Sequence, residues 1–151
     1  MKVYLARHGQ CNSNLNKIYN YKNEDLNETG IEQAKQLREK LTNIDIDVIY
    51  SSPLLRAKHT AEIININNKE ILFDERLRER EHGSLEGKSI DVTDREEYWN
   101  YYTTARYGTE ERIPELFDRV KSFLDELKNK EYNSVLIVAH SGVSKAFYAY
   151  F

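Results

Sequence analysis

The chain has 151 residues, of which 40% are hydrophobic, and this is enough to bury the core of one compact domain. Its 22 basic and 25 acidic residues give a net charge of −3, which excludes a bulk attraction to nucleic acid or to an anionic membrane surface. The single cysteine excludes an internal disulfide, and no apolar stretch approaches the ~20 residues that span a bilayer, so we expect a cytoplasmic protein.

The first third of the chain predicts a strand, a long loop and a helix. The strand is the β-rich run at residues 2–6, and the polar, Asn-rich stretch 9–28 is typical of a loop. Thr29 then begins a helix as its N-cap, with Glu32 as the capping-box partner. The apolar face of this helix follows the helical repeat at Ile31, Ala34, Leu37 and Leu41.

The middle of the chain continues the alternation of strand and helix. A second strand is predicted at residues 47–50. Ser52 and Pro53 fit the N-cap and N1 positions of a helix that ends near Ile64. A weaker third strand is predicted at residues 70–73.

Charged residues and two glycines predict a loop over residues 78–90. Thr93 with Glu96 fits a second capping box, which predicts a helix that runs to about Tyr107. A long amphipathic helix follows, and its apolar positions are Ile113, Leu116, Phe117, Val120, Leu124 and Leu127.

The last two elements indicate the fold class. Residues 134–139 are almost wholly apolar, as expected for a central strand of a parallel sheet, and a final helix begins near Gly142. Alternating strands and helices predict an α/β fold, a three-layer α/β/α sandwich with a mostly parallel sheet.

Polar side chains follow each predicted strand, at the edge of the sheet where such folds bind ligands. These residues are Arg7 and His8, then Ser51 and Ser52 with Arg56 one turn later, Glu79, and finally His140 and Ser141. Arginine forks match phosphate oxygens, an imidazole can attack phosphorus, and a carboxylic acid can protonate the leaving oxygen. Two imidazoles, two guanidiniums and a carboxylate therefore indicate phosphoryl transfer.

Five sequence segments occur in one order along nearly the whole chain. They are residues 7–10 (RHGQ) with Asn14, 26–34 (LNETGIEQA), 51–61 (SSPLLRAKHTA), 77–87 (LREREHGSLEG) and 135–143 (VLIVAHSGV). In this order they resemble the histidine phosphatase superfamily, also called the phosphoglycerate mutase-like family. The resemblance implies the same α/β sandwich that the periodicity predicts.

The resemblance also implies roles for individual residues. His8 matches the nucleophile that becomes phosphohistidine. The expected catalytic residues are His8, Glu79, Arg7, Arg56 and His140, and the expected substrate-binding residues are Arg7, Gly9, Asn14, Arg56, His140 and Ser141. No metal and no other cofactor is implied.

Glu79 matches the proton donor of the family. It is the glutamate in a Leu-x-Glu-x-x-x-Gly pattern that begins at Leu77 and ends at Gly83. Glu81 is a competitor two residues later, but the count back from Gly83 favours Glu79.

The activity that the resemblance implies is a metal-independent phosphatase acting on a small phosphorylated metabolite. Phosphoglycerate mutase activity is the alternative within the family. The short insert between Glu79 and His140 predicts a pocket open to water, which favours hydrolysis.

Two alternatives from other classes remain open. One is a metallohydrolase that uses His8, His140 and Glu79 as ligands, although no close His-x-x-x-His spacing supports it. The other is a non-catalytic module that only binds a phosphorylated ligand.

The end of the chain differs from the pattern of the family. Relatives usually continue beyond the last helix, whereas this sequence ends at Phe151 on an aromatic run. We therefore expect one histidine phosphatase domain over residues 1–151 that lacks a C-terminal segment.

Overall fold

Four parallel strands form the centre of the structure, a computed structural model that describes residues 1–151. The strands are β1 Lys2–Arg7, β2 Val48–Ser51, β3 Ile71–Phe73 and β4 Ser134–Ala139. Their order is β1-β4-β2-β3, and every neighbouring pair is parallel. β4 therefore lies between two other strands, which confirms the prediction from its apolar sequence.

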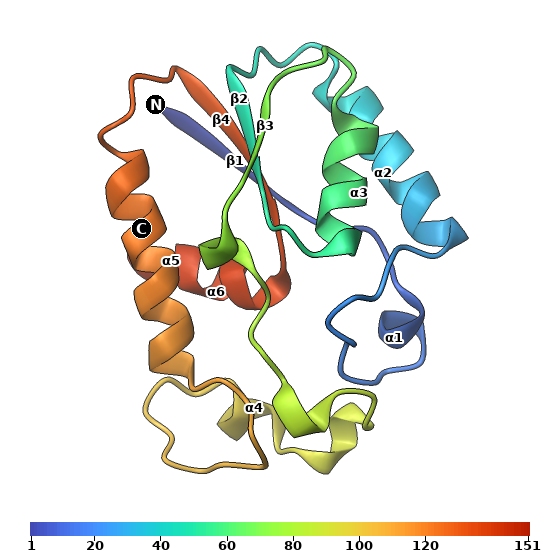
Figure 1. The fold of residues 1–151 in the computed structure, drawn as a ribbon, viewed down its shortest axis with the longest axis vertical. Helices are drawn as coiled ribbons and strands as arrows, with labels where there is room; N and C mark the ends of the chain where they lie inside the picture. Colours follow the sequence, from blue (N-terminus) through green and yellow to red (C-terminus); the bar gives the residue numbers. More distant parts are fainter.

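Helices cover both faces of this sheet (Figure 1). The helices are α1 Asn12–Leu15, α2 Glu28–Leu41, α3 Leu55–Ile64, α4 Arg95–Tyr98, α5 Ile113–Leu127 and α6 Ser141–Tyr150. α2 and α3 lie against one face, and α5 and α6 lie against the other (Figure 1). The predicted three-layer sandwich is thus confirmed.

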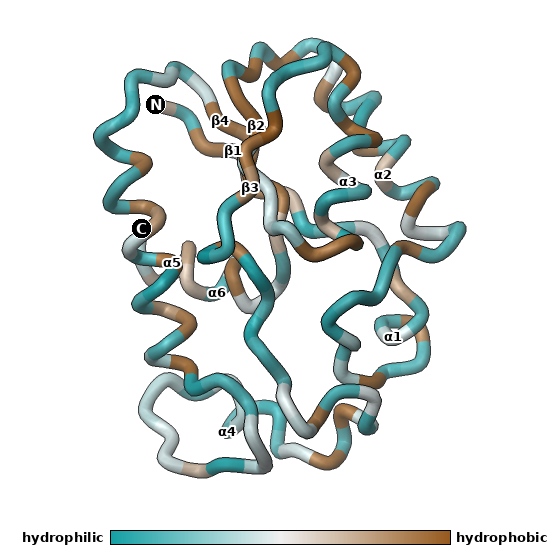
Figure 2. The backbone as a smooth tube through the Cα atoms, in the orientation of Figure 1, coloured by the Kyte–Doolittle hydropathy of each residue, from teal (hydrophilic) through white to brown (hydrophobic).

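The side chains of β4 divide the core into two layers. Val135, Ile137 and Ala139 belong to the cluster beneath α5 and α6, whereas Leu136 and Val138 belong to the cluster beneath α2 and α3. This follows from the two-residue repeat of a strand, which points successive side chains to opposite faces. In Figure 2 the hydrophobic residues gather on the strands, and the chain that descends from β3 is largely hydrophilic.

The prediction that Thr29 caps the second helix is wrong by two residues. α2 begins at Glu28, and Asn27 is its N-cap, because the Asn27 side chain accepts a hydrogen bond from Gly30 N at 2.8 Å. The predicted loop 9–28 also contains a short helix, α1.

The third helix begins later than predicted. α3 begins at Leu55, with Leu54 as N-cap, rather than at Pro53. Ser52 is not its cap, because the Ser52 N–H donates to Val138 O at 3.0 Å and so extends the pairing of β2 with β4.

The predicted helix from Thr93 to Tyr107 is wrong. Only α4 is helical there, and its cap is Asp94, whose side chain accepts from Glu97 N. The Thr93 hydroxyl is instead hydrogen-bonded to Tyr19 and donates to Ile90 O, so it is not available as a helix cap.

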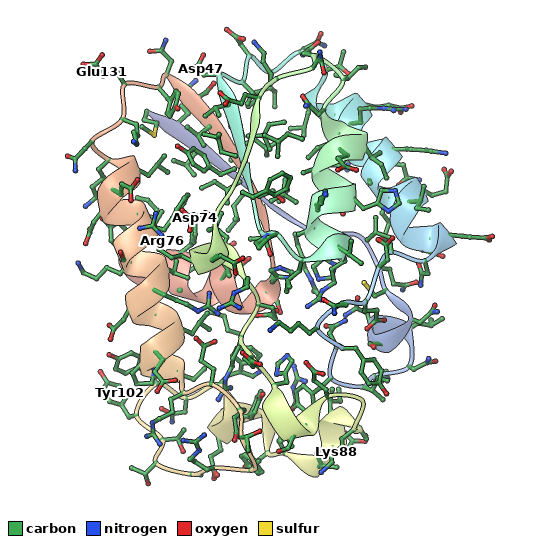
Figure 3. All side chains as sticks on the ribbon, in the orientation of Figure 1. Asp47, Asp74, Arg76, Lys88, Tyr102 and Glu131 are labelled. Atoms are coloured by element: carbon green, nitrogen blue, oxygen red, sulfur yellow. The ribbon has the colours of Figure 1, made fainter.

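The carboxyl ends of the strands meet at one end of the sheet. Arg7 is the last residue of β1, Ser51 ends β2, and His140 follows β4 directly as the N-cap of α6. Asp47, just before β2, is labelled at the opposite end of the sheet (Figure 3). None of the helices has both the length and the apolar character that a membrane crossing requires.

Candidate active site

His8 lies at the end of β1 and is only 6% exposed. Its backbone N–H donates to Ala139 O at 3.0 Å, which continues the pairing of β1 with β4. Its ring Nδ1 is 2.6 Å from Gly9 O. Because a carbonyl can only accept, Nδ1 carries the proton, and Nε2 keeps its lone pair. The ring is thus held with an unprotonated nitrogen available for attack.

The surroundings of His8 keep this imidazole neutral. Burial, together with the positive charges of Arg56 and Arg7, lowers the pKa of His8 to about 3. A cationic imidazole has no lone pair with which to attack phosphorus. At neutral pH the group is therefore in its nucleophilic form.

Gly9 fixes the loop that follows the nucleophile. Its N–H donates to Thr60 Oγ1 at 3.1 Å, and its carbonyl accepts from His8. A Cβ on Gly9 would lie 2.3 Å from Gly30 O, so only glycine permits this close approach to α2. Because both its backbone polar groups are engaged, Gly9 holds His8 in position and offers no free donor to a substrate.

His140 is fully buried, and its ring centroid lies 5.1 Å from that of His8. Its Nε2 is 2.8 Å from Ser52 Oγ, which also accepts from Leu54 N. The Ser52 hydroxyl has no other acceptor for its hydrogen, so we assign that hydrogen to Nε2, which places the ring proton of His140 on Nδ1. Burial, followed by the charges of neighbouring groups, lowers the pKa of His140 well below its usual value.

Arg56 extends from the first turn of α3 and is only 2% exposed. Its Nη1 donates to the carbonyls of Tyr21 and Lys22 at 3.0 and 3.3 Å. Two buried nitrogens of this region, Arg56 Nε and His140 Nδ1, have no hydrogen-bond partner in the protein. Buried donors are nearly always paired, and an anion with several acceptor oxygens would satisfy both.

Arg7 and Asn14 lie on the open side of the nucleophile. With His8 and Gly9 they line a hollow of about 290 Å³. Asn14 Oδ1 accepts from Cys11 N at 2.9 Å, so its amide hydrogens are free to donate outward. The side chain of Arg7 has no hydrogen-bond partner in the protein and can meet an anion in the same hollow.

Glu79 approaches the same end of the sheet from the chain after β3. It is 8% exposed, and its Oε1 accepts from Arg80 N at 2.7 Å and from Gly142 N at 3.1 Å. Ser141 Oγ donates to the other oxygen at 3.3 Å. A Cβ on Gly142 would lie 2.3 Å from Oε1, so the glycine leaves room for the carboxylate.

Four of the expected site residues share one cleft of about 330 Å³. Arg7, Asn14, Glu79 and Ser141 all line it, whereas Glu81, the competitor for the role of proton donor, does not. The structure therefore brings the two imidazoles, the two arginines and Glu79 to one end of the sheet.

Arg119 is a residue of this region that sequence reasoning missed. From α5 it donates to Arg76 O and Arg78 O at 2.7 Å and to Glu79 O at 3.1 Å. Its remaining donors bind both oxygens of Glu111 at 2.8 and 2.9 Å. The guanidinium thus fixes the backbone of Glu79, and no feature of the sequence distinguishes it from other arginines on amphipathic helices.

The aromatic residues between Glu79 and His140 fall into two groups. Tyr98 is buried, is hydrogen-bonded to His82 Nδ1 at 2.6 Å and packs under the Arg80 guanidinium, and Trp99 lines the cleft. Tyr101 and Tyr102 line a separate surface groove, and Tyr102 stands at the margin of the molecule (Figure 3). Of these four residues only Trp99 lines the cleft, and Tyr98 packs against it from the interior.

The metallohydrolase alternative lacks a ligand set. No group of three or more His, Cys, Asp and Glu side chains has an arrangement that could hold a metal ion. The oxygens of Glu79 are instead bound by the N–H groups of Arg80 and Gly142.

Relatives with named activities cover most of this chain. A "Putative phosphoserine phosphatase 2" of Hydrogenobacter thermophilus is 35% identical over 96% of this chain and 75% of its own length. A "Probable phosphoglycerate mutase GpmB" of Escherichia coli is 36% identical over 93% of this chain and 69% of its own length.

Solved structures agree with this relationship. A putative α-ribazole-5′-P phosphatase from Escherichia coli superposes with a TM-score of 0.87 at 26% identity, over 99% of this chain and 78% of that one. YhfR of Bacillus stearothermophilus gives a TM-score of 0.85 at 28% identity, over 98% and 78% of the two chains. The family model of the histidine phosphatase superfamily (branch 1) matches residues 3–151, and the chain belongs to this superfamily.

Proposed function

We propose that His8 is the nucleophile and Glu79 the proton donor of a metal-independent phosphatase that acts on small phosphate monoesters. Membership of the superfamily and relatives named as phosphatases make the chain a phosphomonoesterase that works through a phosphohistidine, with mutase activity as the alternative. The proposal assigns that chemistry to particular side chains.

The observation that carries the assignment is the state of His8. Its Nδ1 proton is held by Gly9 O, so the lone pair is on Nε2, beside His140 and the positive charges of Arg56 and Arg7. A phosphate between these groups would accept from Arg56 Nε and His140 Nδ1, two of the three buried side-chain nitrogens that lack a hydrogen-bond partner. The same contacts would stabilise charge on the equatorial oxygens during transfer.

The reaction then proceeds in two displacements. In the first, His8 Nε2 bonds to phosphorus while the bond to the leaving oxygen breaks, and protonated Glu79 gives its proton to that oxygen. In the second, water attacks phosphorus, Glu79 takes the water proton, and the phosphorus–nitrogen bond breaks. Inorganic phosphate leaves, and His8 and Glu79 return to their starting states.

The substrate is a small phosphorylated metabolite in this proposal. Phosphoserine and α-ribazole phosphate, which the names of relatives mention, are the first compounds to assay. The single free cysteine supports a cytoplasmic location as part of the same proposal.

Phosphoglycerate mutase is the second candidate, favoured by the 36% identity to a probable mutase. A mutase would transfer the phosphoryl group of His8 to a hydroxyl of a sugar acid instead of to water. Incubation with 3-phosphoglycerate and a trace of bisphosphoglycerate separates the two, since a mutase forms 2-phosphoglycerate and a phosphatase releases inorganic phosphate.

The test of the nucleophile is a rapid-quench experiment with a radiolabelled phosphate monoester. The wild type should form an acid-labile phosphoenzyme, and His8→Ala should form none and lose activity by about 10⁴-fold or more. His59→Ala is the matched control, because His59 pairs with Asp25 on the outer side of α3. Near-normal turnover by His8→Ala would overturn the assignment, and phosphate binding without any phosphoenzyme in the wild type would reduce the chain to a binding module.

A further inference from the structure

Ser52 follows β2 directly, and its side chain is completely buried. Its backbone N–H donates to Val138 O at 3.0 Å, and its carbonyl accepts from Ser51 Oγ at 2.9 Å. Val138 belongs to β4 and lies two residues before His140. Hydrogen bonds between neighbouring parallel strands therefore fix the position of Ser52 relative to His140.

The hydroxyl group of Ser52 has one hydrogen to donate and two lone pairs. One lone pair accepts from Leu54 N at 3.3 Å, and the hydrogen has a single acceptor in the protein, His140 Nε2, at 2.8 Å. A buried hydroxyl that left its hydrogen unpaired would lose its bond to water without replacement. The Ser52 hydroxyl therefore donates to Nε2, and the one proton of the neutral imidazole is left to Nδ1.

The tautomer of His140 decides what this ring can do for a phosphate. Nδ1 is buried and has no hydrogen-bond partner in the protein. With the proton on Nδ1, this nitrogen can donate to a phosphate oxygen, whereas with the proton on Nε2 it would present a lone pair to another acceptor. A cationic ring could donate from both nitrogens, but burial lowers the pKa of His140 well below its usual value.

The two imidazoles of the site are set in the same tautomer by opposite means. Gly9 O accepts the Nδ1 proton of His8 at 2.6 Å, whereas the Ser52 hydroxyl donates to Nε2 of His140. His8 is thereby left with a lone pair on Nε2, and His140 with an N–H group on Nδ1. The rings lie 5.1 Å apart, so one phosphoryl group can meet a nucleophile on one ring and a donor on the other.

We infer that Ser52 is a positioning residue that sets the tautomer of His140, so that a neutral ring donates from Nδ1 to the transferred phosphoryl group. A hydrogen bond at one ring nitrogen determines the form of the other in many histidine sites. Ser52 touches no substrate, and no proton passes between it and His140. The inference rests on the proposed phosphatase function, in which the phosphoryl group is transferred to His8 beside His140.

The first measurement is the tautomer itself. In isotope-labelled protein at neutral pH, long-range proton–nitrogen correlation spectra distinguish Nδ1–H, Nε2–H and doubly protonated imidazoles. The chain has four histidines, so the signal that persists in each of the variants His8→Asn, His59→Asn and His82→Asn belongs to His140. We expect the Nδ1–H form in the wild type. An Nε2–H form there would overturn the inference, whether or not any variant of Ser52 folds.

Ser52→Ala removes the hydroxyl without adding volume. The Nδ1–H fraction of His140 should fall, and the inhibition constant of inorganic phosphate should rise by about tenfold or more, as expected for one charge-assisted hydrogen bond. kcat/KM should fall by a similar factor for alkyl phosphates and for p-nitrophenyl phosphate, because the lost contact is to the transferred group and not to the leaving group. Ser52→Thr keeps the hydroxyl and should restore the Nδ1–H form and most of the phosphate affinity.

Ser134→Ala is the matched control. Ser134 is a buried serine at the other end of β4, and its hydroxyl donates to Asp45 O. This variant should lower the thermal unfolding midpoint by about as much as Ser52→Ala, since each loses one buried hydrogen bond, and it should leave the His140 signal and the inhibition by phosphate unchanged.

The outcomes distinguish the role of Ser52 from the underlying activity. Ser52→Ala with an unchanged tautomer, or with an unchanged inhibition constant of phosphate, would overturn the inference and leave the phosphatase intact. A wild type that holds the Nδ1–H form of His140 but forms no phosphoenzyme would overturn the proposed function and not the tautomer.

Discussion

The active site consists of two halves that the fold holds in different ways. His8, Arg56 and His140 form the phosphate half, and each lies at a strand end or in the first helical turn after one. Glu79 is the centre of the proton-donor half, and it lies in irregular chain six residues beyond the end of β3. The sheet ladder extends to His8 and Ser52, whereas side chains and turns from other elements hold Glu79.

This difference separates two kinds of positioning. Backbone pairing in a parallel sheet places the phosphate half, and the same pairing stabilises the fold. The proton-donor half depends on the guanidinium of Arg119 and on the backbone N–H groups of Arg80 and Gly142. Changes in the first half should therefore affect every substrate alike, and changes in the second should depend on the leaving group.

The largest effect in this comparison should come from Arg56→Gln. Loss of a buried guanidinium removes stabilisation of the transferred phosphoryl group, which costs on the order of 10³-fold in kcat/KM. The loss should be the same for alkyl phosphates and p-nitrophenyl phosphate, and inhibition by inorganic phosphate should weaken in parallel. A loss confined to alkyl phosphates would contradict the division into halves.

Because Arg56 also binds the carbonyls of Tyr21 and Lys22, its replacement affects packing. Arg56→Lys serves as the second variant, since lysine keeps the charge but not the planar fork. It should retain the unfolding midpoint better than Arg56→Gln and still lose activity on all substrates equally.

Glu79→Gln should give the next largest effect. Without a proton donor, hydrolysis of alkyl phosphates should fall on the order of 10²-fold in kcat, whereas p-nitrophenol leaves without protonation, and its ester should lose less than about tenfold. The inhibition constant of inorganic phosphate should stay close to that of the wild type. Equal losses for both esters would remove Glu79 from the role of acid.

Arg119→Gln should reproduce the Glu79 pattern at smaller amplitude. The guanidinium touches no substrate, but it holds the carbonyls of Arg76, Arg78 and Glu79. Without this guanidinium the Glu79 carboxyl group is positioned less precisely. We expect about a tenfold fall in kcat for alkyl phosphates and little change for p-nitrophenyl phosphate. Arg119→Lys should recover part of the difference.

A purely structural role for Arg119 predicts another pattern. Lower stability alone would reduce the activities on alkyl phosphates and on p-nitrophenyl phosphate together, in proportion to the folded fraction. The ratio of the two rates, measured well below the unfolding midpoint, therefore distinguishes positioning from folding. Arg106→Gln is a control, because Arg106 is exposed and its guanidinium donates to Glu110 O away from the cleft.

The same division explains how much could be predicted from the sequence. The apolar run 134–139 identified the central strand, and strand ends then identified where His8 and His140 meet. Arg119 contacts the backbone of Arg76, Arg78 and Glu79, which lie 40 or more positions earlier in the sequence, and no periodicity reports these contacts. The proton donor could be named from a motif, but the way it is held could not.

The errors in secondary structure have a related cause. Thr93 looked like a helix cap, yet its hydroxyl bonds to Tyr19, a residue 74 positions earlier. Ser52 looked like another cap, yet it extends the sheet and binds His140. In both cases a tertiary partner competed with the local signal and prevailed.

The smallest predicted effect is on stability, and it concerns the buried imidazoles. Burial lowers the pKa of His8 to about 3 and lowers that of His140 well below 6.5, so both are neutral in the folded protein at pH 5 and protonated in the unfolded chain. The unfolded state then binds more protons, and the free energy of unfolding should fall as the pH drops from 6.5 toward 3. Each group contributes a slope of up to about 1 kcal/mol per pH unit.

The contribution of the imidazoles to the pH dependence of stability can be isolated between pH 6.5 and 5. Carboxylates such as Asp74 and Glu110 have lowered pKa values and stay ionised in this range. Urea unfolding at several pH values in this range gives the free energy of unfolding as a function of pH. For His8→Asn this free energy should change less steeply with pH than for the wild type, by up to about 1 kcal/mol per pH unit. His59→Asn, at a half-exposed site, is the control. An unchanged slope for His8→Asn would mean that the nucleophile is protonated in the folded protein, and the phosphate half would then lack the neutral imidazole on which its chemistry depends.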